Sequence, residues 1–515
     1  MAFNFISCDR DQAFLMAPSL REWVPEDHLV WTVLDAVGEM DLGAFYRDYR
    51  QDGHGRPAYE PSMMVALLLY AYARGNRSSR GIERACIEDV AHRIVAGNLV
   101  PDHSTIADFR VRHEAALAEL FTGVLGLCRR AGLVSVGVVA IDGTRVHANA
   151  SRDANRSYEQ IAREILEEAA ETDRREDALY GDRRGDELPE QLRTAAGRKA
   201  ALRQAKEKLE RERPGEEAEP DTEERAGAAV KLELDPERFV TRPEGRRAWL
   251  REGRRALEER REREARPIMR SRSERLCESA RRLEAELSVE HEANTAYEAY
   301  RARGVMKDGR RFGARPRPYR PPQLPPGKIN TTDPDSWVMK TFGRYALQGY
   351  NAQAAVNEHQ ILLAAEVTVD APDFGHLEPI VDATERELNA LGAKQPQTVV
   401  ADAGYWHKRQ MENVLARAIQ VLIAPDGGLR KTTRPGWDGG LYAFMRRVLQ
   451  TEQGKALYRR RKATVEPVFG QIKFNRGFER FGRRGRSACR SEWRLFGASH
   501  NLLKLHSHRI AAAGG

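Results

Sequence analysis

The chain of 515 residues has few cysteines, few aromatic residues and no long apolar run. Its five cysteines are scattered without a Cys-x-x-Cys pair, at Cys8, Cys86, Cys128, Cys277 and Cys489. This usage argues against a structural zinc site and fits a reducing cytoplasm. The longest apolar stretch, residues 63–73, is too short to cross a bilayer and lies in the interior of the sequence, so neither a signal peptide nor a membrane span is expected.

An excess of one charge sign is nearly absent from the chain as a whole, because 84 Lys plus Arg face 76 Asp plus Glu and leave a net charge of +8. The excess is local: residues 451–515 hold 15 basic and 4 acidic side chains, or +11, and the rest of the chain sums to −3. Such a segment is typical of a surface that contacts phosphates. Interleaved apolar residues predict that it is folded, namely Phe474, Phe478, Phe481, Trp493 and Leu495.

Two aspartates each follow a short apolar run bounded by turn residues. Residues 134–141 precede Asp142, and residues 398–401 precede Asp402. Such runs are typical of fully buried strands, although periodicity alone leaves a buried helix open. An Asp-Gly after a strand is also a common turn signal, so either aspartate taken alone is better explained as a turn.

A third acid, Glu466, stands in a strongly basic stretch and is followed seven residues later by Lys473. Seven residues make two helical turns, so the two side chains are expected on one helix face, which Gly470 leaves open. Pro467 predicts that the helix begins here or is kinked. A carboxylate among so many basic residues could instead only neutralise its surroundings.

These residue types suit phosphoryl transfer by two divalent ions, which need hard oxygen ligands from separate elements. Asp142, Asp402 and Glu466 are the expected catalytic and metal-binding residues. Mg²⁺ is the expected ion, with Mn²⁺ as an alternative, because carboxylate-plus-water sites favour it and no dense His or Cys cluster competes. Lys473 and Arg461 are expected to hold the phosphate backbone of a nucleic acid.

Five segments of the chain together resemble the bacterial insertion-sequence transposases of the DDE class. They are AIDGTRVHANAS with Asp142, TDPDS at 332–336, GYNAQAAVNE at 349–358, ADAGY with Asp402, and a Tyr-Arg-Glu-Lys signature at Tyr458, Arg461, Glu466 and Lys473. The spacing from Arg461 to Glu466 is one residue longer than in the best-known form of that signature, where Lys462 would take the Arg position. Tyr458 and Lys462 therefore join Arg461 and Lys473 as expected DNA contacts.

The resemblance implies an α/β catalytic domain similar to ribonuclease H, with the first Asp on strand one, the second after strand four and the Glu on a late helix. It also implies double-stranded DNA as partner, at both the element ends and the target, a homodimer in the DNA complex, and a place on the bacterial nucleoid in the cytoplasm. The implied reaction is strand hydrolysis at the element ends, followed by attack of the freed 3′-hydroxyl on target DNA.

Two other functions stay open at this point. One is a catalytically inert DNA-binding regulator derived from such an enzyme. The other is a coiled-coil scaffold built on residues 151–305, which is poorly supported because the Leu spacing breaks after two heptads.

The first 130 residues predict a helical domain that resembles the N-terminal domain of the same transposases. Residues 61–74 predict an apolar helix closed by Gly75, and Thr105 with Asp108 predicts a capping box for a helix that runs to Arg130. Polar and basic residues at the start of that helix suit a helix-turn-helix DNA reader, with a plain helical bundle as the alternative, and the resemblance favours DNA binding. Its expected DNA contacts are Thr105, Arg110 and Arg112.

The region 151–290 is unusually charged, with 69 of 140 side chains ionisable as Asp, Glu, Lys or Arg. It predicts exposed helices, such as a hairpin of 243–264 against 267–305, or partial disorder. Strands are expected at 334–341, 348–357 and 361–369. The expected domains are a helical DNA-binding domain 1–130, the first catalytic strand 131–150, a charged insertion and Pro-rich linker 151–327, the rest of the catalytic domain 328–482 with a small insertion 425–451, and a basic C-terminal tail 483–515.

Overall fold

The computed structural model describes residues 19–47, 49, 57–180, 234, 236, 245–263, 271–306, 309–314, 318–320, 322–340, 346–426 and 439–513. The chain forms two compact units. The first comprises Met1–Asn155, Glu237–Pro243 and Thr332–Gly515, and the second comprises Arg156–Pro236 and Glu244–Thr331. The N-terminal helices therefore belong to the same unit as the main sheet, whereas the sequence-based boundaries placed them in a domain of their own.

The N-terminal part of the first unit is helical, as its sequence predicts. Its elements are a 3-10 turn (Leu20–Glu22), α1 (Leu29–Glu39), α2 (Gly43–Tyr46), α3 (Pro61–Ala73), α4 (Ser79–Glu88), α5 (Val90–Val95), α6 (His103–Arg112) and α7 (Glu114–Arg130). α3 begins at Pro61, which suits a first helical position, and its side chains from Met64 to Ala73 are buried. Gly75 follows with a φ of +78°, and a Cβ there would lie 3.0 Å from the carbonyl oxygen of Arg476. Only glycine suits this turn, because it combines a positive φ with a close backbone approach.

The predicted single helix from Thr105 to Arg130 is wrong. Two helices, α6 and α7, meet at His113, whose backbone is not helical (φ −105°, ψ 29°) and whose buried ring packs against Phe109. The N-cap of α6 is Asp102, which accepts the Thr105 N–H, so the predicted capping box at Thr105 and Asp108 is also wrong. A buried ring at the junction outweighs the helical propensity of the flanking residues.

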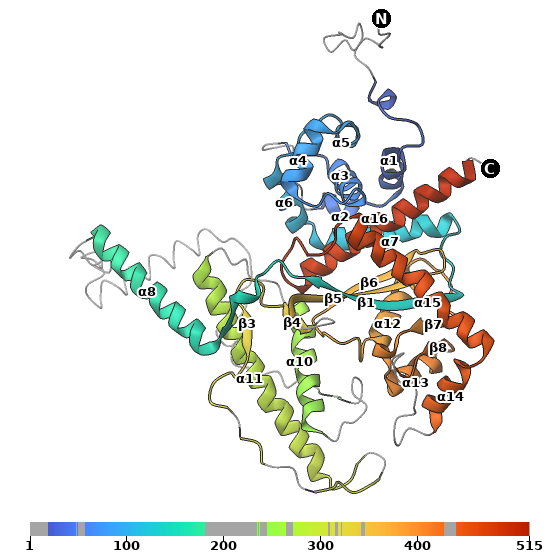
Figure 1. Cartoon of the computed structure of the whole chain (residues 1–515). Coiled ribbons are helices and arrows are strands. Elements are labelled where there is room, and N and C mark those ends of the chain that lie inside the picture. The colour runs from blue at the N-terminus through green and yellow to red at the C-terminus, as the bar shows by residue number, and fades with distance from the viewer. Residues whose placement is uncertain are drawn as a thin grey trace, which may run out of the picture. The chain divides into compact units, whose positions relative to one another are not determined.

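A six-stranded mixed sheet forms the centre of the first unit (Figure 1). Its strands are β1 (Val138–His147), β4 (Trp337–Lys340), β5 (Ala346–Asn357), β6 (Leu362–Thr368), β7 (Thr398–Ala401) and β8 (Gln420–Ile423). The order is β4-β5-β1-β7-β8, and β6 also pairs with β5. β1 is antiparallel to β5 but parallel to β7, which is parallel to β8. The strands predicted after residue 330 are confirmed to within a few residues at each end.

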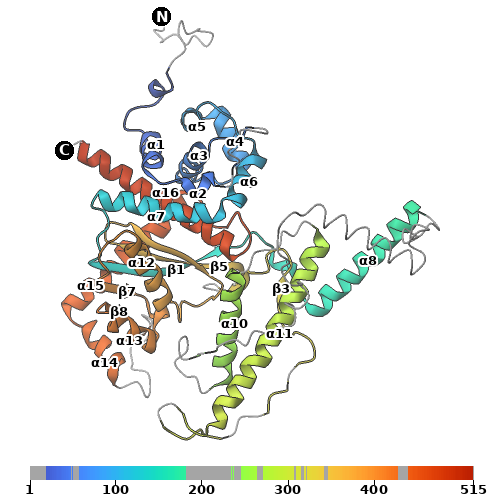
Figure 2. The ribbon, with the colours of Figure 1, turned by 180° about the vertical axis from the view of Figure 1, so that it is seen from behind.

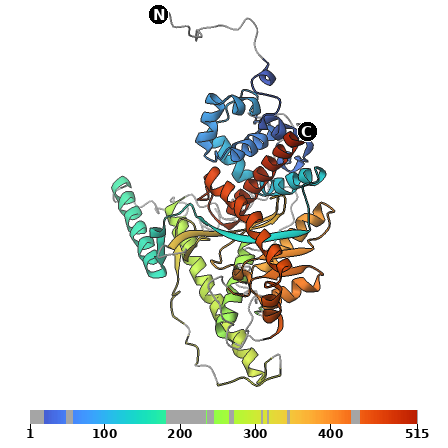
Figure 3. The same ribbon diagram turned by 45° about the vertical axis from the view of Figure 1, so that its right-hand side comes forward.

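Helices cover both faces of this sheet. They are α12 (Leu377–Ala390), α13 (Lys408–Ala416), α14 (Gly440–Val448), α15 (Glu452–Gly470) and α16 (Arg486–Ala513), with short turns at Arg152–Ala154, Ala403–Tyr405 and Gln471–Asn475. α16 and α7 lie over one face and α12 lies over the other, and α16 is the red helix above the sheet that leads to the C-terminus in Figure 3. No helix in the described part of the chain combines the length and the apolar character of a membrane span.

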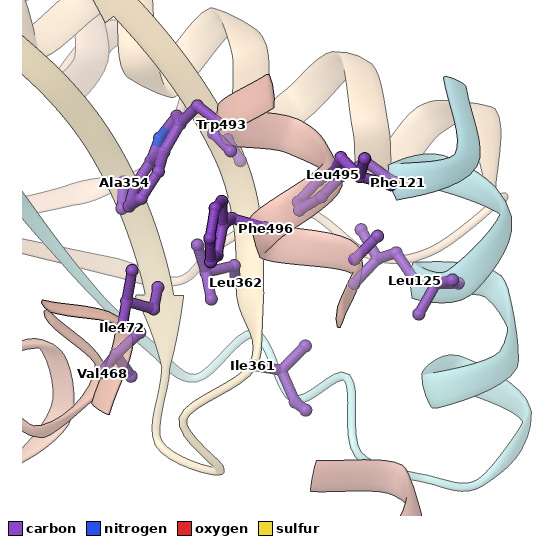
Figure 4. Close-up of a cluster of buried hydrophobic side chains, with 14 of the residues drawn as sticks. Phe121, Leu125, Ala354, Ile361, Leu362, Val468, Ile472, Trp493, Leu495 and Phe496 are labelled. Atoms are coloured by element: carbon purple, nitrogen blue, oxygen red, sulfur yellow. The ribbon is translucent and has the colours of Figure 1, made fainter. Parts of the chain in front are cut away.

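α16 is the central core helix of the first unit. Figure 4 shows Trp493 and Phe496 directed at Ala354 and Leu362 in the sheet, while Leu495 faces Phe121 of α7. A buried ion pair between Arg494 and Glu387 (2.7 Å) ties α16 to α12. Residues 486–513 are therefore a packed helix, and not the basic tail expected for 483–515. Of the aromatic residues that predicted a folded segment, Phe474 alone is strongly exposed, at 83%.

The second unit contains a small two-stranded sheet, β2 (Asn155–Ser157) with β3 (Lys328–Asn330), and the helices α8 (Tyr158–Tyr180), α10 (Arg246–Arg263) and α11 (Arg272–Ala302). α10 and α11 lie side by side (Figure 2), with the rings of Trp249 and Tyr300 5.5 Å apart. A Cβ on Gly253 would come within 2.9 Å of Val289, so glycine permits this close approach. Both helices fall where the sequence predicts a helical hairpin. Of the predicted Pro-rich linker and small insertion, residues 316–317, 321 and 427–438 lie outside the described residues.

Candidate active site

The first two predicted acids lie at the same level of two neighbouring parallel strands. Ile141 of β1 pairs with Ala401 of β7, so the next residues, Asp142 and Asp402, stand where this ladder ends. β1 itself continues to His147 by pairing with β5, so Asp142 lies within a strand. The apolar run had predicted that Asp142 follows the end of the strand, and this is wrong. The carboxylates meet where β7 stops and leaves the edge of β1 uncovered.

Asp142 is a largely buried carboxylate that is paired with an arginine from α15. Its Oδ2 accepts a hydrogen bond from Nη1 of Arg461 at 2.7 Å, and its Oδ1 accepts the N–H of Gly143. Burial raises the pKa of Asp142 to about 6; Arg461 opposes this shift and Asp402 adds to it. The protein therefore holds this acid in a site where its negative charge is costly without a nearby cation.

Asp402 begins the short turn Ala403–Tyr405, and its Oδ1 accepts the N–H of Gly404 at 2.8 Å. Burial raises the pKa of Asp402, and Asp373 raises it further. Its second oxygen, Oδ2, accepts no hydrogen bond from the described residues. Asp402 is therefore held by the backbone of the turn and lies beside the negative charge of Asp373.

α15 carries the tyrosine, arginine and glutamate of the predicted signature. Arg461 is only 9% exposed; it lies 5.9 Å from the centre of the Tyr458 ring, and its Nη2 approaches Oε1 of Glu466 at 3.9 Å. Glu466 is 54% exposed, and Lys462 points to solvent. Arg461, and not Lys462, faces the carboxylates, even though the spacing to Glu466 is one residue longer than in the usual signature.

Pro467 neither begins α15 nor ends it, because the helix runs from Glu452 to Gly470. Of the two expectations for Pro467, a helix start is therefore wrong, and a kink of the helix stays a prediction. A proline has no N–H to offer the carbonyl four residues earlier, which here is that of Ala463. The side chain of Gln360 donates to this carbonyl at 3.3 Å and replaces the missing bond.

Lys473 lies in a π-helical turn, Gln471–Asn475, which follows α15. The expectation that it shares an α-helical face with Glu466 does not apply across this turn, because the angular spacing of residues changes there. Its Nζ donates to the carbonyl of Arg145 in β1 at 2.9 Å, and burial lowers the pKa of the ammonium group. The turn thus brings Lys473 to the strand that carries Asp142.

The residues predicted to contact DNA in the N-terminal part lie on α6. The hydroxyl of Thr105 donates to Asp102 at 2.6 Å, so it takes part in the helix cap. Arg110 packs its guanidinium over Tyr72 at 5.7 Å, and Arg112 is an exposed residue whose guanidinium lies 4.5 Å from the ring of Tyr49. Their contact with DNA stays a prediction.

A fourth acid, Asp373, lies beside the first two and was missed in the sequence. It sits in the loop between β6 and α12, where its Oδ1 accepts hydrogen bonds from Asn351 and Gln353, each at 2.8 Å. The acid that directly follows the predicted strand 361–369 is Asp370, so the strand-end rule alone would not have selected Asp373. The two amides belong to the segment GYNAQAAVNE, so the structure also gives that segment a role.

Carboxylate oxygens are the donors that Mg²⁺ prefers, so the chemistry of these residues fits a divalent ion. Two glycines leave room at the site: a Cβ on Gly404 would lie 2.9 Å from Oδ1 of Asp402, and one on Gly143 would collide with Asp373. Within the described residues, no three His, Cys, Asp or Glu side chains are grouped as metal ligands. Arg461 supplies the positive charge at Asp142 in this structure.

Comparison with known protein families adds two matches. A transposase domain (DUF772) matches residues 18–112, and a transposase DDE domain matches residues 429–506, which include Tyr458, Arg461, Glu466 and Lys473. The searches of curated proteins and of solved structures gave no match. The two family matches, together with the acids on β1 and β7, support an insertion-sequence transposase of the DDE class.

Proposed function

We propose that this transposase cuts DNA at the ends of its own element and transfers the freed strand into target DNA, with Asp142, Asp402 and Glu466 as its metal-binding acids. The observation that carries the proposal is the convergence of elements that are distant in sequence. β1 and β7 present Asp142 and Asp402 at one level. Arg461 and Glu466 come from α15: Arg461 forms an ion pair with Asp142, and Glu466 approaches Arg461.

The strand directions support a catalytic core similar to ribonuclease H. β6, β5 and β1 form an antiparallel series, and β7 and β8 continue from β1 in parallel. The first acid lies on the first strand, the second follows β7, and the third lies on a late helix. This is the arrangement expected from the resemblance in sequence.

Each group has a proposed task. Divalent ions held by the three acids would activate the attacking water or hydroxyl and stabilise the leaving oxygen. Arg461 neutralises Asp142 in the DNA-free chain and is placed to take a phosphate oxygen of the DNA backbone. Lys473 is partly buried beside β1 and would add positive charge next to the bound DNA strand.

Duplex DNA is the proposed partner, and a homodimer is proposed for the DNA complex because two element ends must be handled together. No observation favours the alternative of an inert DNA-binding regulator. All three acids are present, and Asp142 keeps its charged partner.

The test is cleavage of DNA that carries the sequences flanking the reading frame. Asp142→Ala, Asp402→Ala and Glu466→Ala are each expected to lower Mg²⁺-dependent cleavage by a factor of at least about 10³, since each would remove a ligand. DNA binding, measured by gel shift, is expected to persist in all three. A matched control is Glu452→Ala, which removes an 86% exposed acid from the same helix as Glu466.

The Glu452 variant is expected to cut as the unaltered protein does. Undiminished cleavage by all three acid variants would overturn the proposal. Cleavage by the unaltered protein that needs no divalent ion would also overturn it.

A further inference from the structure

Asp373 reaches the candidate site from the face of the sheet opposite to Arg461. Asp142 pairs with Ala354 across the β1–β5 ladder, and Gly143 pairs with Gln353. Directly paired residues point to one face, and successive residues alternate. Asp142 and its arginine are therefore on one face, and Gln353 with the carboxylate it binds is on the other.

Gly143 follows Asp142 in β1, and a side chain at this position would lie on the same face as Gln353. A Cβ at this position would run into Oδ1 of Asp373 and Nε2 of Gln353, and would lie 2.8 Å from Oδ1 of Asn351. The space that a side chain would take on β1 is thus filled by Asp373 and the amides that hold it. The carboxylate comes directly against the strand next to Asp142.

The two oxygens of Asp373 have different surroundings. Oδ1 accepts both amide hydrogen bonds, from Asn351 and Gln353, which are each 2% exposed. Oδ2 accepts no hydrogen bond from the described residues. It lies 3.3 Å from the point where a Cβ on Gly404 would be, and Oδ1 of Asp402 lies 2.9 Å from the same point.

A chain of hydrogen bonds fixes Asp373 to the turn that follows Asp402. Tyr405, fully buried, donates its hydroxyl to Oε1 of Gln353, and Nε2 of Gln353 donates to Asp373. A carboxylate held in this way through one oxygen has little rotational freedom. Such orientation of a ligand by neighbouring amides is a common feature of metal sites in proteins.

Arg461 lies on the other face of the sheet, against Asp142. Its guanidinium is nine-tenths buried and lies against Asp142, and its Nε atom is buried without a partner in the described part of the chain. Arg461 therefore supplies the positive charge on the Asp142 side, and a divalent cation at Asp142 would have to displace it.

We propose that Asp373 is a fourth carboxylate ligand for a divalent cation, acting through Oδ2 beside Asp402. The inference rests on the proposed function, because it adds a ligand to the same site. Asn351 and Gln353 would serve as positioning residues that fix the other oxygen. Mg²⁺ and Mn²⁺ are the cations that this set of oxygens fits.

The experiment measures cation binding directly, by calorimetric titration of Mn²⁺ into the full-length protein, with and without DNA that carries the flanking sequences. Asp373→Asn keeps an oxygen that accepts both amide bonds and removes only the charge. It is expected to weaken Mn²⁺ binding at least about tenfold, a typical loss at a metal site. Asp370→Asn, three residues earlier in the same loop and paired with His376 at 3.1 Å, is the matched control and is expected to bind as the unaltered protein does.

A third variant separates a ligand from a merely structural residue. Asp373→Cys is expected to lose Mg²⁺ binding but to keep Cd²⁺ binding, because a thiolate prefers a softer metal. If Asp373→Asn bound Mn²⁺ as tightly as Asp370→Asn while Asp142→Asn bound it weakly, Asp373 would not be a ligand and the proposed function would stand. If the unaltered protein bound no divalent cation even with DNA, both would be overturned.

Discussion

Asp142 is expected to destabilise the folded chain at neutral pH, and its replacement by Asn should reveal this. The pKa of Asp142 rises from 3.8 to about 6 on folding, chiefly through burial. An acid whose pKa is raised in the folded state stabilises the fold below the unfolded pKa, and this contribution is lost as pH rises through the folded pKa. At about 1.4 kcal/mol per pKa unit, the charged form costs up to about 3 kcal/mol above pH 6.

Asp142→Asn mimics the protonated form and retains an oxygen for Arg461. Its advantage in stability over the unaltered protein should therefore be small near pH 4.5 and should grow by about 2 kcal/mol by pH 8, which corresponds to a few degrees in Tm for a unit of this size. Scanning calorimetry at pH 4.5, 6 and 8 measures this difference. Mg²⁺ at pH 8 should narrow it, since the ion stabilises only the protein with the carboxylate.

Asp102→Ala is the matched control for this experiment. The carboxylate of Asp102 caps α6, and its hydrogen bonds to Ser104 and Thr105 lower its pKa. It is ionised throughout the range from pH 5 to 8, so its replacement should lower Tm by an amount that does not vary with pH in that range. A Tm difference for Asp142→Asn that is equally independent of pH would refute the reasoning.

Three further predictions concern neighbouring residues. Arg461→Gln should strengthen Mn²⁺ binding to the DNA-free protein about tenfold, measured by calorimetric titration, because it removes the cation that competes at Asp142. Gly404→Ala should lower Mg²⁺-dependent cleavage at least about tenfold, because its Cβ would enter the space between two carboxylates. Pro467→Ala should raise the free energy of unfolding by up to about 3 kcal/mol, and so raise Tm, because it restores an N–H inside α15.

Each of these predictions has its control. Arg460→Gln removes a neighbouring charge that is 60% exposed, and should leave Mn²⁺ affinity unchanged. Gly439→Ala adds a methyl group with nothing within 4 Å, and should leave cleavage unchanged. Equal metal affinity in Arg461→Gln and Arg460→Gln would contradict competition at Asp142, and a lower Tm for Pro467→Ala would mean that the proline fits its helix better than an alanine.

The central strands could be predicted from sequence because they are buried on both faces. Residues 398–401 and 361–369 are short apolar runs between turn residues, and β7 and β6 form there. β1 was placed too early, at 134–141, because its second half carries polar residues. The second half of β1 is a strand because it pairs with β5, and such pairing cannot be predicted from hydrophobicity.

The candidate site could be predicted only in part. The apolar runs that precede them identify Asp142 and Asp402, but the ion pair of Asp142 with Arg461 joins residues 319 positions apart. The spacing rule for Glu466 and Lys473 assumed one continuous α-helix, and the π-helical turn at 471–475 breaks that assumption. Asp373 was missed because its importance depends on two amides of β5 that hold it.

α16 also determines when this protein can fold during its synthesis. The helix follows every other described element in chain order, yet α3, α7 and β6 all pack against it. The apolar residues of these elements that face α16 have no cover until residues 486–513 have left the ribosome, and uncovered apolar faces are targets for chaperones and proteases. A chain cut short before this helix would therefore expose the apolar residues of α7 and β6 that α16 buries.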